Sequence, residues 1–406
     1  MSCETCAGCN AELRKTVFEK CKEDYKAITA FTYSYKRHSR PTSMLLSLTN
    51  RCNLACNYCF VKQNPQDMTL EIAEKAVSIL LENCKLKDQK PHLNFFGGEP
   101  LLMYEEIIVP LVEKYSPLID FGITTNGVLL NEDIVDFFYH HDVKVLLSFD
   151  GVAEVQNKQR SNSFNQVLLN IPYLLLRLPE TTMRSTVTKH SIPYLYESVL
   201  MAEELGFKKI AFCPNAYEEW DKDIENLMYE QWKKIGHHIY KGLMSNKKVI
   251  SVDPLVKFYK NTNAALQENL FFNNNIERCG LGTTTCAIAP NGDIVPCQEK
   301  TSCPTVILGN VNTNIDANIH KAFLINYFNR INDISCDKGC DQKAKLNCLS
   351  DICPSRFEDL NYKFSTASCA FIRTSTSVAN RLHYLCANSS YNHIRRYFGE
   401  GVISNG

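Results

Sequence analysis

Residues 49–60 read TNRCNLACNYCF and carry Cys52, Cys56 and Cys59 in a C-x3-C-x2-C spacing. This segment directly follows an apolar run, Met44 to Leu48, which predicts a β-strand. Three thiolates in one loop after a strand can bind a [4Fe-4S] cluster and leave one iron without a protein ligand. The alternative is a structural zinc site that lacks one ligand, although structural zinc normally takes four protein ligands.

Downstream of this segment, β-prone runs alternate with amphipathic stretches, a pattern typical of βα units and a parallel sheet. The predicted strands are 44–48, 93–96, 119–124, 143–149, 182–188 and 209–213. The predicted helices are 69–84, 104–115, 131–141, 164–177 and 193–205, with a further helical segment near 221–244. Six units are fewer than the eight of a closed barrel, so we predict an α/β fold, a partial (β/α)6 barrel.

The overall composition excludes several classes of protein. The chain has 406 residues, with 44 Lys plus Arg and 44 Asp plus Glu, and no long block of one charge sign. We therefore expect no nucleic-acid partner and no membrane partner. No stretch of 18 apolar residues and no apolar signal core occur, which predicts a cytoplasmic protein. Nineteen cysteines in such a chain indicate bound metal more than disulfides.

Most of the remaining cysteines lie in the last third of the chain. This group comprises Cys279, Cys286, Cys297, Cys303, Cys336, Cys340, Cys348, Cys353, Cys369 and Cys386. Short β-prone runs flank a turn at residues 290–293, which predicts a small module stapled by metal. Cys84 and Cys213 lie in apolar runs and are expected to be core thiols.

The N-terminal cysteines leave three alternatives open. Cys3, Cys6, Cys9 and Cys21 fit a further cluster, a tail that exchanges thiols with a substrate, or a reactive terminus. The expected regions are an N-terminal extension (1–43), the partial barrel (44–243), a linker (244–278), the cysteine-rich module (279–375) and a helical tail (376–406).

The C-x3-C-x2-C motif, followed by the aromatic Phe60, resembles the defining motif of radical S-adenosylmethionine (SAM) enzymes. Further segments after successive predicted strands resemble that family: GGEP at 97–100, TTNG at 124–127 and SFDG at 148–151. The resemblance implies that the three cysteines bind a catalytic [4Fe-4S] cluster. It also implies that SAM is bound by Phe60, Gly97, Gly98, Glu99, Pro100, Thr125, Asn126, Ser148, Asp150 and Arg160.

The C-terminal cysteines resemble the SPASM domain, which carries two auxiliary [4Fe-4S] clusters in some radical SAM enzymes. The resemblance implies that Cys279, Cys286, Cys297 and Cys353 bind auxiliary cluster I and that Cys336, Cys340, Cys348 and Cys369 bind auxiliary cluster II. The last four closely spaced cysteines have gaps of three, seven and four residues, where the family has two, five and three. A pair of zinc sites is the alternative. Cys286 is the weakest ligand, and Cys303 is the spare candidate.

The resemblance implies that a 5′-deoxyadenosyl radical, formed from SAM, abstracts hydrogen from a peptide. Enzymes with a SPASM domain mostly modify ribosomal precursor peptides (RiPPs) or a Cys or Ser of a sulfatase. We expect a RiPP maturase that forms an intrapeptide crosslink, a Cys thioether, and that takes electrons from a flavodoxin or ferredoxin. The alternative is an anaerobic sulfatase maturase, but those enzymes have Asp after the Cys that matches Cys297, where this chain has Gln298 and then Glu299.

Glu299 and the metal-binding cysteines each allow one further interpretation. Glu299 is a candidate general base beside auxiliary cluster I, and a surface carboxylate is the other interpretation. The hypothesis from another class is a non-catalytic iron-sulfur or zinc scaffold, which predicts no turnover of SAM.

Overall fold

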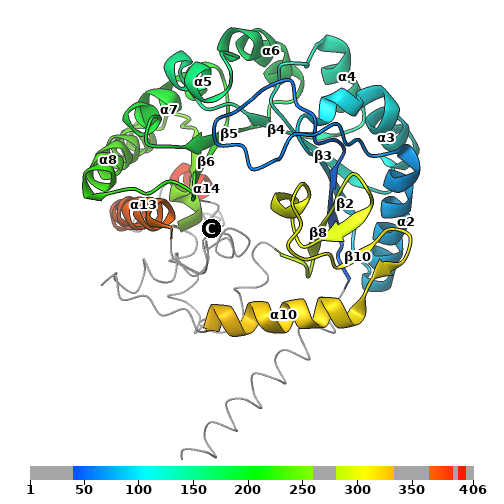
Figure 1. The fold of residues 1–406 in the computed structure, drawn as a ribbon. Helices are drawn as coiled ribbons and strands as arrows, with labels where there is room; N and C mark the ends of the chain where they lie inside the picture. Colours follow the sequence, from blue (N-terminus) through cyan, green and yellow to red (C-terminus); the bar gives the residue numbers. More distant parts are fainter. Residues whose placement is uncertain (1–39, 259–279, 333–364, 387–391, 399–406) are drawn as a thin grey trace, which may run out of the picture.

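The computed structural model describes residues 40–258, 280–332, 365–386 and 392–398. The four N-terminal cysteines lie outside these ranges, as do Cys279, Cys336, Cys340, Cys348 and Cys353. Within the described residues the chain forms an α/β fold around one mixed sheet of 11 strands, with helices along the outside (Figure 1). No helix in these ranges is long and apolar enough to cross a membrane.

Seven parallel strands form the central part of the sheet in chain order. They are β1 (Ser43–Ser47), β2 (His92–Phe96), β3 (Asp120–Thr125), β4 (Lys144–Ser148), β5 (Thr182–Val187), β6 (Lys209–Pro214) and β7 (Ser251–Asp253). The first six strands were predicted to within one or two residues. Strand β7 was not predicted, because its three residues include only one apolar side chain, Val252.

The cysteine-rich region continues the same sheet beyond β1. Strand β8 (Thr285–Ile288) pairs parallel with β1, and β9 (Asp293–Val295), β10 (Gly309–Asn310) and β11 (Asn314–Ile315) follow as antiparallel hairpins. The predicted turn at 290–293 joins β8 to β9, and Gly292 adopts a φ of 86° there. The beginning of this module therefore adds its own strands to the open edge of the barrel sheet.

Helices separate the parallel strands and pack on the outer face of the sheet (Figure 1). They are α2 (Leu70–Lys87), α3 (Val109–Tyr115), α4 (Glu132–His140), α5 (Ala153–Gln159), α6 (Phe164–Arg177), α7 (Leu195–Glu204) and α8 (Lys222–Met244). A π-helical turn, η3 (Tyr104–Ile108), precedes α3, and η2 (Pro100–Met103), η4 (Ile192–Tyr194) and η5 (Gln298–Lys300) are single 3-10 turns. The side chains of Thr69, Asn131 and Asp221 cap α2, α4 and α8 by accepting a backbone N–H in the first turn.

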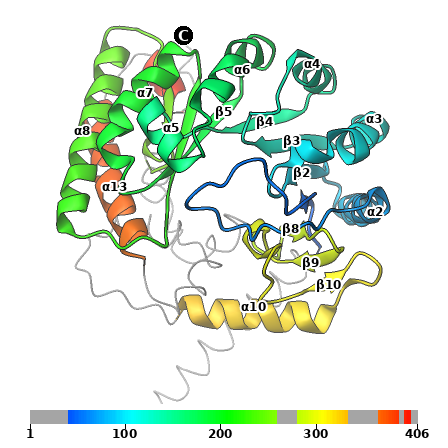
Figure 2. The same ribbon diagram turned by 45° about the horizontal axis from the view of Figure 1, so that its top comes forward.

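The C-terminal part contributes α10 (Ala317–Asn332), α13 (Thr366–Cys386) and α14 (Asn392–Tyr397). Helix α10 lies beside the β8–β10 hairpins, and α13 lies beside α8 at the other end of the sheet (Figure 2). The ring of Phe371 on α13 packs edge-on against Trp232 of α8, with centroids 5.5 Å apart. Arg373 of α13 forms a two-pronged ion pair with Glu225 of α8. The predicted boundary between residues 375 and 376 falls inside α13.

The two faces of the parallel sheet differ in exposure. Side chains on the outer face, such as Met44, Phe95 and Met183, are fully buried under the helices. Their neighbours on the inner face, such as Asn94 and Thr124, are only partly buried. Because side chains alternate along a strand, every second residue of β1 to β7 faces the interior of the barrel.

Candidate functional site

The three motif cysteines lie in the loop between β1 and α2, at the carboxyl end of the parallel strands. The backbone N–H of Cys59 donates to the carbonyl of Cys56, and the N–H of Leu54 lies 3.4 Å from the sulfur of Cys52. The pKa of the Cys56 thiol is raised to about 11, mainly by burial, which the charge of Arg160 opposes and the nearby Cys59 and Cys52 reinforce. The loop thus gathers three thiols within electrostatic range of one another.

Two side chains from other loops donate toward these sulfurs. Nδ2 of Asn126, in the turn after β3, lies 3.7 Å from Sγ of Cys52. Nη1 of Arg160, which follows α5, lies 3.7 Å from Sγ of Cys56. N–H donors of this kind stabilise thiolates that bind an iron-sulfur cluster. The donor set therefore fits a cluster, in which each of the three thiolates binds a different iron.

A single metal ion is a poorer fit to this loop. Within the described residues, no three side chains of the His, Cys, Asp or Glu type converge closely enough to chelate one ion.

The GGEP segment packs directly against the cysteine loop. A Cβ atom on Gly97 would lie 2.4 Å from the carbonyl oxygen of Thr49, and one on Gly98 would lie 2.0 Å from that of Arg51. The N–H of Gly98 donates to the carbonyl of Thr49, and the N–H of Glu99 donates to that of Arg51. Glycine is required at both positions because only a bare backbone can approach the loop this closely.

Glu99 is buried and is held by three hydrogen bonds. Its Oε1 accepts from the N–H of Leu101 and from Oγ1 of Thr125, and its Oε2 accepts from the N–H of Asn126 at 2.8 Å. Burial raises the pKa of this carboxyl to about 7 even though these bonds oppose the shift. A carboxylate has about four acceptor positions, so Oε2 retains one for a further donor. Pro100 follows as the first residue of η2 and is buried.

Asp150 is the centre of a second buried network. Its Oδ2 accepts from the hydroxyl of Tyr58 at 2.5 Å, from Nε2 of Gln159 at 2.8 Å and from Nε of Arg160 at 3.0 Å. Its Oδ1 accepts the N–H of Thr186 at 2.9 Å. Burial alone would lower the pKa of the Arg160 guanidinium, but the nearby Asp150, Tyr58 and Cys56 together outweigh that effect and raise the pKa.

This network ties the cysteine loop to the loop after β4. Tyr58 lies between Cys56 and Cys59 in sequence, and burial raises the pKa of its phenol well above the usual value. Tyr58 was not among the site residues predicted from the sequence. A single aromatic residue in a loop has no periodic pattern, and its position just before the last cysteine was the only signal.

The other predicted SAM-binding residues surround the same loop. Ser148 is the last residue of β4 and is partly exposed on the inner face. The ring of Phe60 stacks on that of Phe96 at a centroid distance of 6.0 Å. All predicted SAM-binding residues therefore lie on the β1–α2 loop, at the carboxyl ends of β3 and β4, or on the segments that follow β2, β3 and β4.

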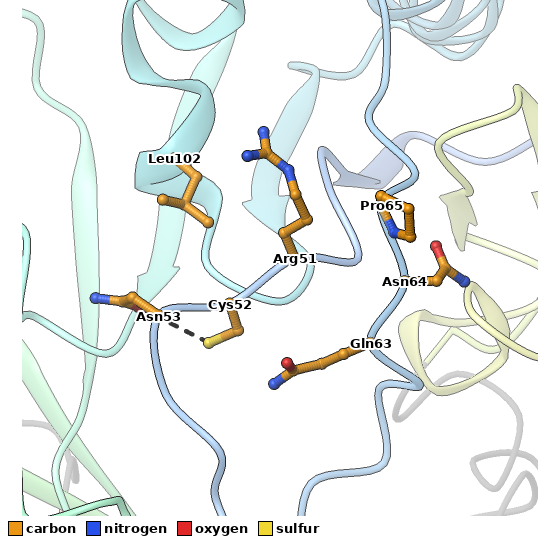
Figure 3. Close-up of a pocket in the computed structure, with 7 residues that line it drawn as sticks. All are labelled: Arg51, Cys52, Asn53, Gln63, Asn64, Pro65 and Leu102. Atoms are coloured by element: carbon orange, nitrogen blue, oxygen red, sulfur yellow. Dashed lines mark hydrogen bonds between the residues drawn. The ribbon is translucent and has the colours of Figure 1, made fainter.

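A cavity of about 420 Å³ opens beside Cys52 (Figure 3). It is lined by Arg51, Cys52, Asn53, Gln63, Asn64, Pro65 and Leu102. Arg51 is held in place by Asp67, with Nε and Nη2 2.9 and 2.7 Å from its two carboxylate oxygens. The cavity gives solvent access to the loop that carries the cysteines.

Three of the eight predicted auxiliary ligands are described. Cys286 lies in β8 level with Met44 of β1, is fully buried, and belongs to the same apolar core. Burial raises the pKa of its thiol to about 12. Cys297 follows β9 and is partly exposed, and Cys369 is buried in α13. Their roles as ligands stay predictions, and the packing of Cys286 is that of a core thiol.

Two more candidates lie near Cys297. Glu299 is in the single turn η5, two residues after Cys297. The spare candidate Cys303 is exposed, and Nζ of Lys62 lies 3.3 Å from its sulfur. Because Lys62 follows Cys59 closely in the chain, Cys303 lies next to the cysteine loop. Of the expected core thiols, Cys84 is buried and Cys213 is partly buried.

Comparison with known proteins agrees with this geometry. Residues 46–228 match the model of the Radical SAM superfamily. The cysteine-type anaerobic sulfatase-maturating enzyme of Clostridium novyi is 28% identical over 227 residues, which cover 47% of this chain and 60% of that protein. The chain spans about 60% of the length of the first curated relatives that it matches.

Solved structures with the same fold include two that hold peptides. The structure of anSMEcpe with bound AdoMet and the Cp18Cys peptide has a TM-score of 0.63 at 18% identity, covering 85% of this chain and 99% of that chain. SuiB of Streptococcus suis bound to the precursor peptide SuiA has a TM-score of 0.54 at 14% identity, covering 86% and 81%. At these identities the likeness establishes the fold.

Proposed function

The chain belongs to the radical SAM superfamily, and from this premise we propose that it is an enzyme that cleaves SAM and modifies a peptide. One observation carries the proposal: the segments after β2, β3 and β4 converge on the loop with Cys52, Cys56 and Cys59. When bound, a [4Fe-4S] cluster there would supply one electron to SAM, yielding methionine and a 5′-deoxyadenosyl radical that removes hydrogen from the substrate.

The residues of the chain would hold and orient this machinery. Cys52, Cys56 and Cys59 would bind three irons, and the fourth iron would remain open to SAM. The free acceptor position on Oε2 of Glu99 would receive the ammonium group of SAM. Ser148, at the end of β4, is positioned to hydrogen-bond the ribose or methionyl part. A low-potential donor such as flavodoxin or ferredoxin would reduce the cluster.

A pH dependence follows from the buried Glu99. Burial raises the pKa of this carboxyl to about 7, so it is mostly protonated below pH 7. It must lose that proton before it can pair with the ammonium group of SAM. We expect the dissociation constant of SAM to rise up to about tenfold for each pH unit below 7. Glu99→Gln should bind SAM weakly and show no such slope. The measurement is calorimetric titration of the reconstituted protein with SAM from pH 5.5 to 7.5, and a wild-type curve that is flat below pH 7 would contradict the role of Glu99.

The substrate is proposed to be a ribosomal precursor peptide, and the product an intrapeptide crosslink formed through a Cys thioether. Several structures of the same fold hold peptides, which supports a peptide as substrate. The product has two hydrogens fewer than the substrate, so a second electron must leave. We propose that auxiliary clusters bound by the C-terminal cysteines accept it, which makes three [4Fe-4S] clusters in total.

The second candidate is an anaerobic sulfatase maturase. The likeness to the Clostridium novyi enzyme favours it. The residues after Cys297 disfavour it, because Gln298 stands where those enzymes have Asp and a neutral amide cannot act as a base. Glu299 is the proposed base in this chain. A sulfatase peptide converted to formylglycine would establish the second candidate, and a crosslinked precursor peptide would establish the first.

Replacement of Cys297 tests the peptide reaction separately from SAM cleavage. In Cys297→Ala we expect 5′-deoxyadenosine to form while the modified peptide falls at least about tenfold, because the second electron has no acceptor. The assay incubates anaerobic protein with SAM, dithionite and candidate precursor peptides, and detects the product by its loss of two mass units. Cys84→Ala, which removes a core thiol, is the control. Full peptide product from Cys297→Ala would contradict the role of an auxiliary cluster.

A further inference from the structure

Two oppositely charged side chains face the interior of the barrel from strands on either side of β6. Arg184 lies in β5 and Asp253 is the last residue of β7, and both are in register with Ala211 of β6. Ser148 of β4 occupies the same row, next to Arg184. Successive strands are about 4.8 Å apart, so the Cα atoms of Arg184 and Asp253 are separated by roughly 10 Å.

The burial pattern places these side chains on the inner face. In β5, Met183, Ser185 and Val187 are fully buried on the outer face, whereas Thr182, Arg184 and Thr186 are partly exposed. In β7, Val252 belongs to the apolar core under the helices and Asp253 faces the other way. Ala211 between them has a side chain too short to separate a ligand from either charge.

Neither charge is satisfied within the described part of the chain. Oδ1 of Asp253 is a buried oxygen without a hydrogen-bond partner there. The guanidinium of Arg184 forms no hydrogen bond and no ion pair with any described residue, whereas the buried Arg160 is paired with Asp150. A buried acceptor without a partner costs free energy, so natural sites of this kind usually bind a ligand group or water.

We propose that Arg184 and Asp253 bind a peptide substrate that carries an acidic group and a basic group near the residue to be modified. This inference rests on the proposed function and specifies its substrate class. Arg184 binds the carboxylate and Asp253 binds the cation. Because the row includes Ser148, at the proposed SAM site, a peptide held across Ala211 presents the residue between the two charges to the reaction centre.

Binding of short synthetic peptides tests this assignment without turnover. Four probes have blocked ends. Their central sequences are Glu-Cys-Lys, Gln-Cys-Lys, Glu-Cys-Gln and Gln-Cys-Gln. A fifth probe has neutral side chains and free, charged ends. Calorimetry measures their dissociation constants for the SAM-loaded, reconstituted full chain. We expect the doubly charged peptide to bind at least about tenfold more tightly than the neutral blocked one. Tight binding of the fifth probe would identify the peptide ends as the charged groups.

A variant of either charged residue should lose only the preference for the peptide group that this residue binds. Arg184→Gln should remove the difference in affinity between the Glu and Gln peptides and keep the difference between the Lys and Gln peptides. Asp253→Asn should keep the first difference and remove the second. Lys144→Gln is the matched control, since Lys144 lies on the same face at the opposite end of β4 and is paired with Asp142. A general loss of folding would weaken all peptides alike.

The outcomes separate this inference from the proposed function. Equal affinities for all probes, or no measurable binding, would contradict the charge pair. Weaker SAM binding by Arg184→Gln with peptide preferences intact would assign Arg184 to the carboxylate of SAM and would also contradict it. If the wild-type protein prefers the charged peptide but never cleaves SAM, the peptide-binding role of Arg184 and Asp253 would be supported and the proposed enzymatic function would be refuted.

Discussion

Replacement of Cys56 by alanine is expected to abolish binding of the catalytic cluster. Cys56 is the central ligand of the loop, and its partner Arg160 donates toward its sulfur from the other side of the site. Two remaining thiolates are too few to hold a [4Fe-4S] cluster in this position. The reconstituted variant should contain about four iron and four sulfide fewer per chain than the wild type, and SAM should no longer perturb the electron paramagnetic resonance spectrum of the reduced protein.

The matched control for this variant is Cys84→Ala. Cys84 is buried, whereas Cys56 is half-buried. Cys84 lies in α2, and its thiol donates to the carbonyl of Thr42. Its loss should cost roughly 1 kcal/mol of stability and no iron. Equal iron contents in Cys56→Ala and wild type would show that the loop does not bind the cluster.

The second large effect is expected from Asp150→Ala. This change leaves the guanidinium of Arg160 buried without its partner and removes the acceptor of Tyr58 and Gln159. Breaking a buried ion pair from one side typically costs about 3–5 kcal/mol, so the midpoint of thermal unfolding should fall by about 5 °C in a chain of this length. Because Tyr58 lies inside the cysteine motif, we also expect a lower cluster content after reconstitution.

Asp136→Ala provides the comparison for Asp150→Ala. Asp136 of α4 also accepts from a tyrosine and an arginine, Tyr173 and Arg177, but near the surface. Exposed pairs contribute roughly 1 kcal/mol or less. Similar losses of stability in the two variants would show that the Asp150 network does not hold the site together.

Much of the barrel could be predicted from local sequence pattern. Helix α6 was predicted at its exact bounds, because its apolar residues recur with helical spacing and a loop with Ser163 precedes it. The strand ends carrying GGEP, TTNG and SFDG were also predicted. Local pattern is sufficient for these elements because each βα unit buries its own apolar residues against the same sheet.

The parts that were missed depend on contacts between distant segments. The parallel pairing of β8 with β1 joins residues more than 200 positions apart, and no periodicity of either strand specifies that partner. The family resemblance predicts that Glu99, Asp150 and Arg160 bind SAM. In the structure these three residues bind protein groups, and Asp150 accepts a hydrogen bond from Tyr58. A sequence motif identifies such residues. Only the residues around them in the folded structure show which hydrogen bonds and ion pairs balance their charges.

The most direct test of the account is formation of 5′-deoxyadenosine by the anaerobically reconstituted wild-type chain with SAM and dithionite. We expect multiple turnovers with wild type and none with Cys56→Ala under the same conditions. Absence of the product from wild type that carries a full cluster, with and without added peptide, would contradict radical SAM chemistry and favour a non-catalytic iron-sulfur scaffold.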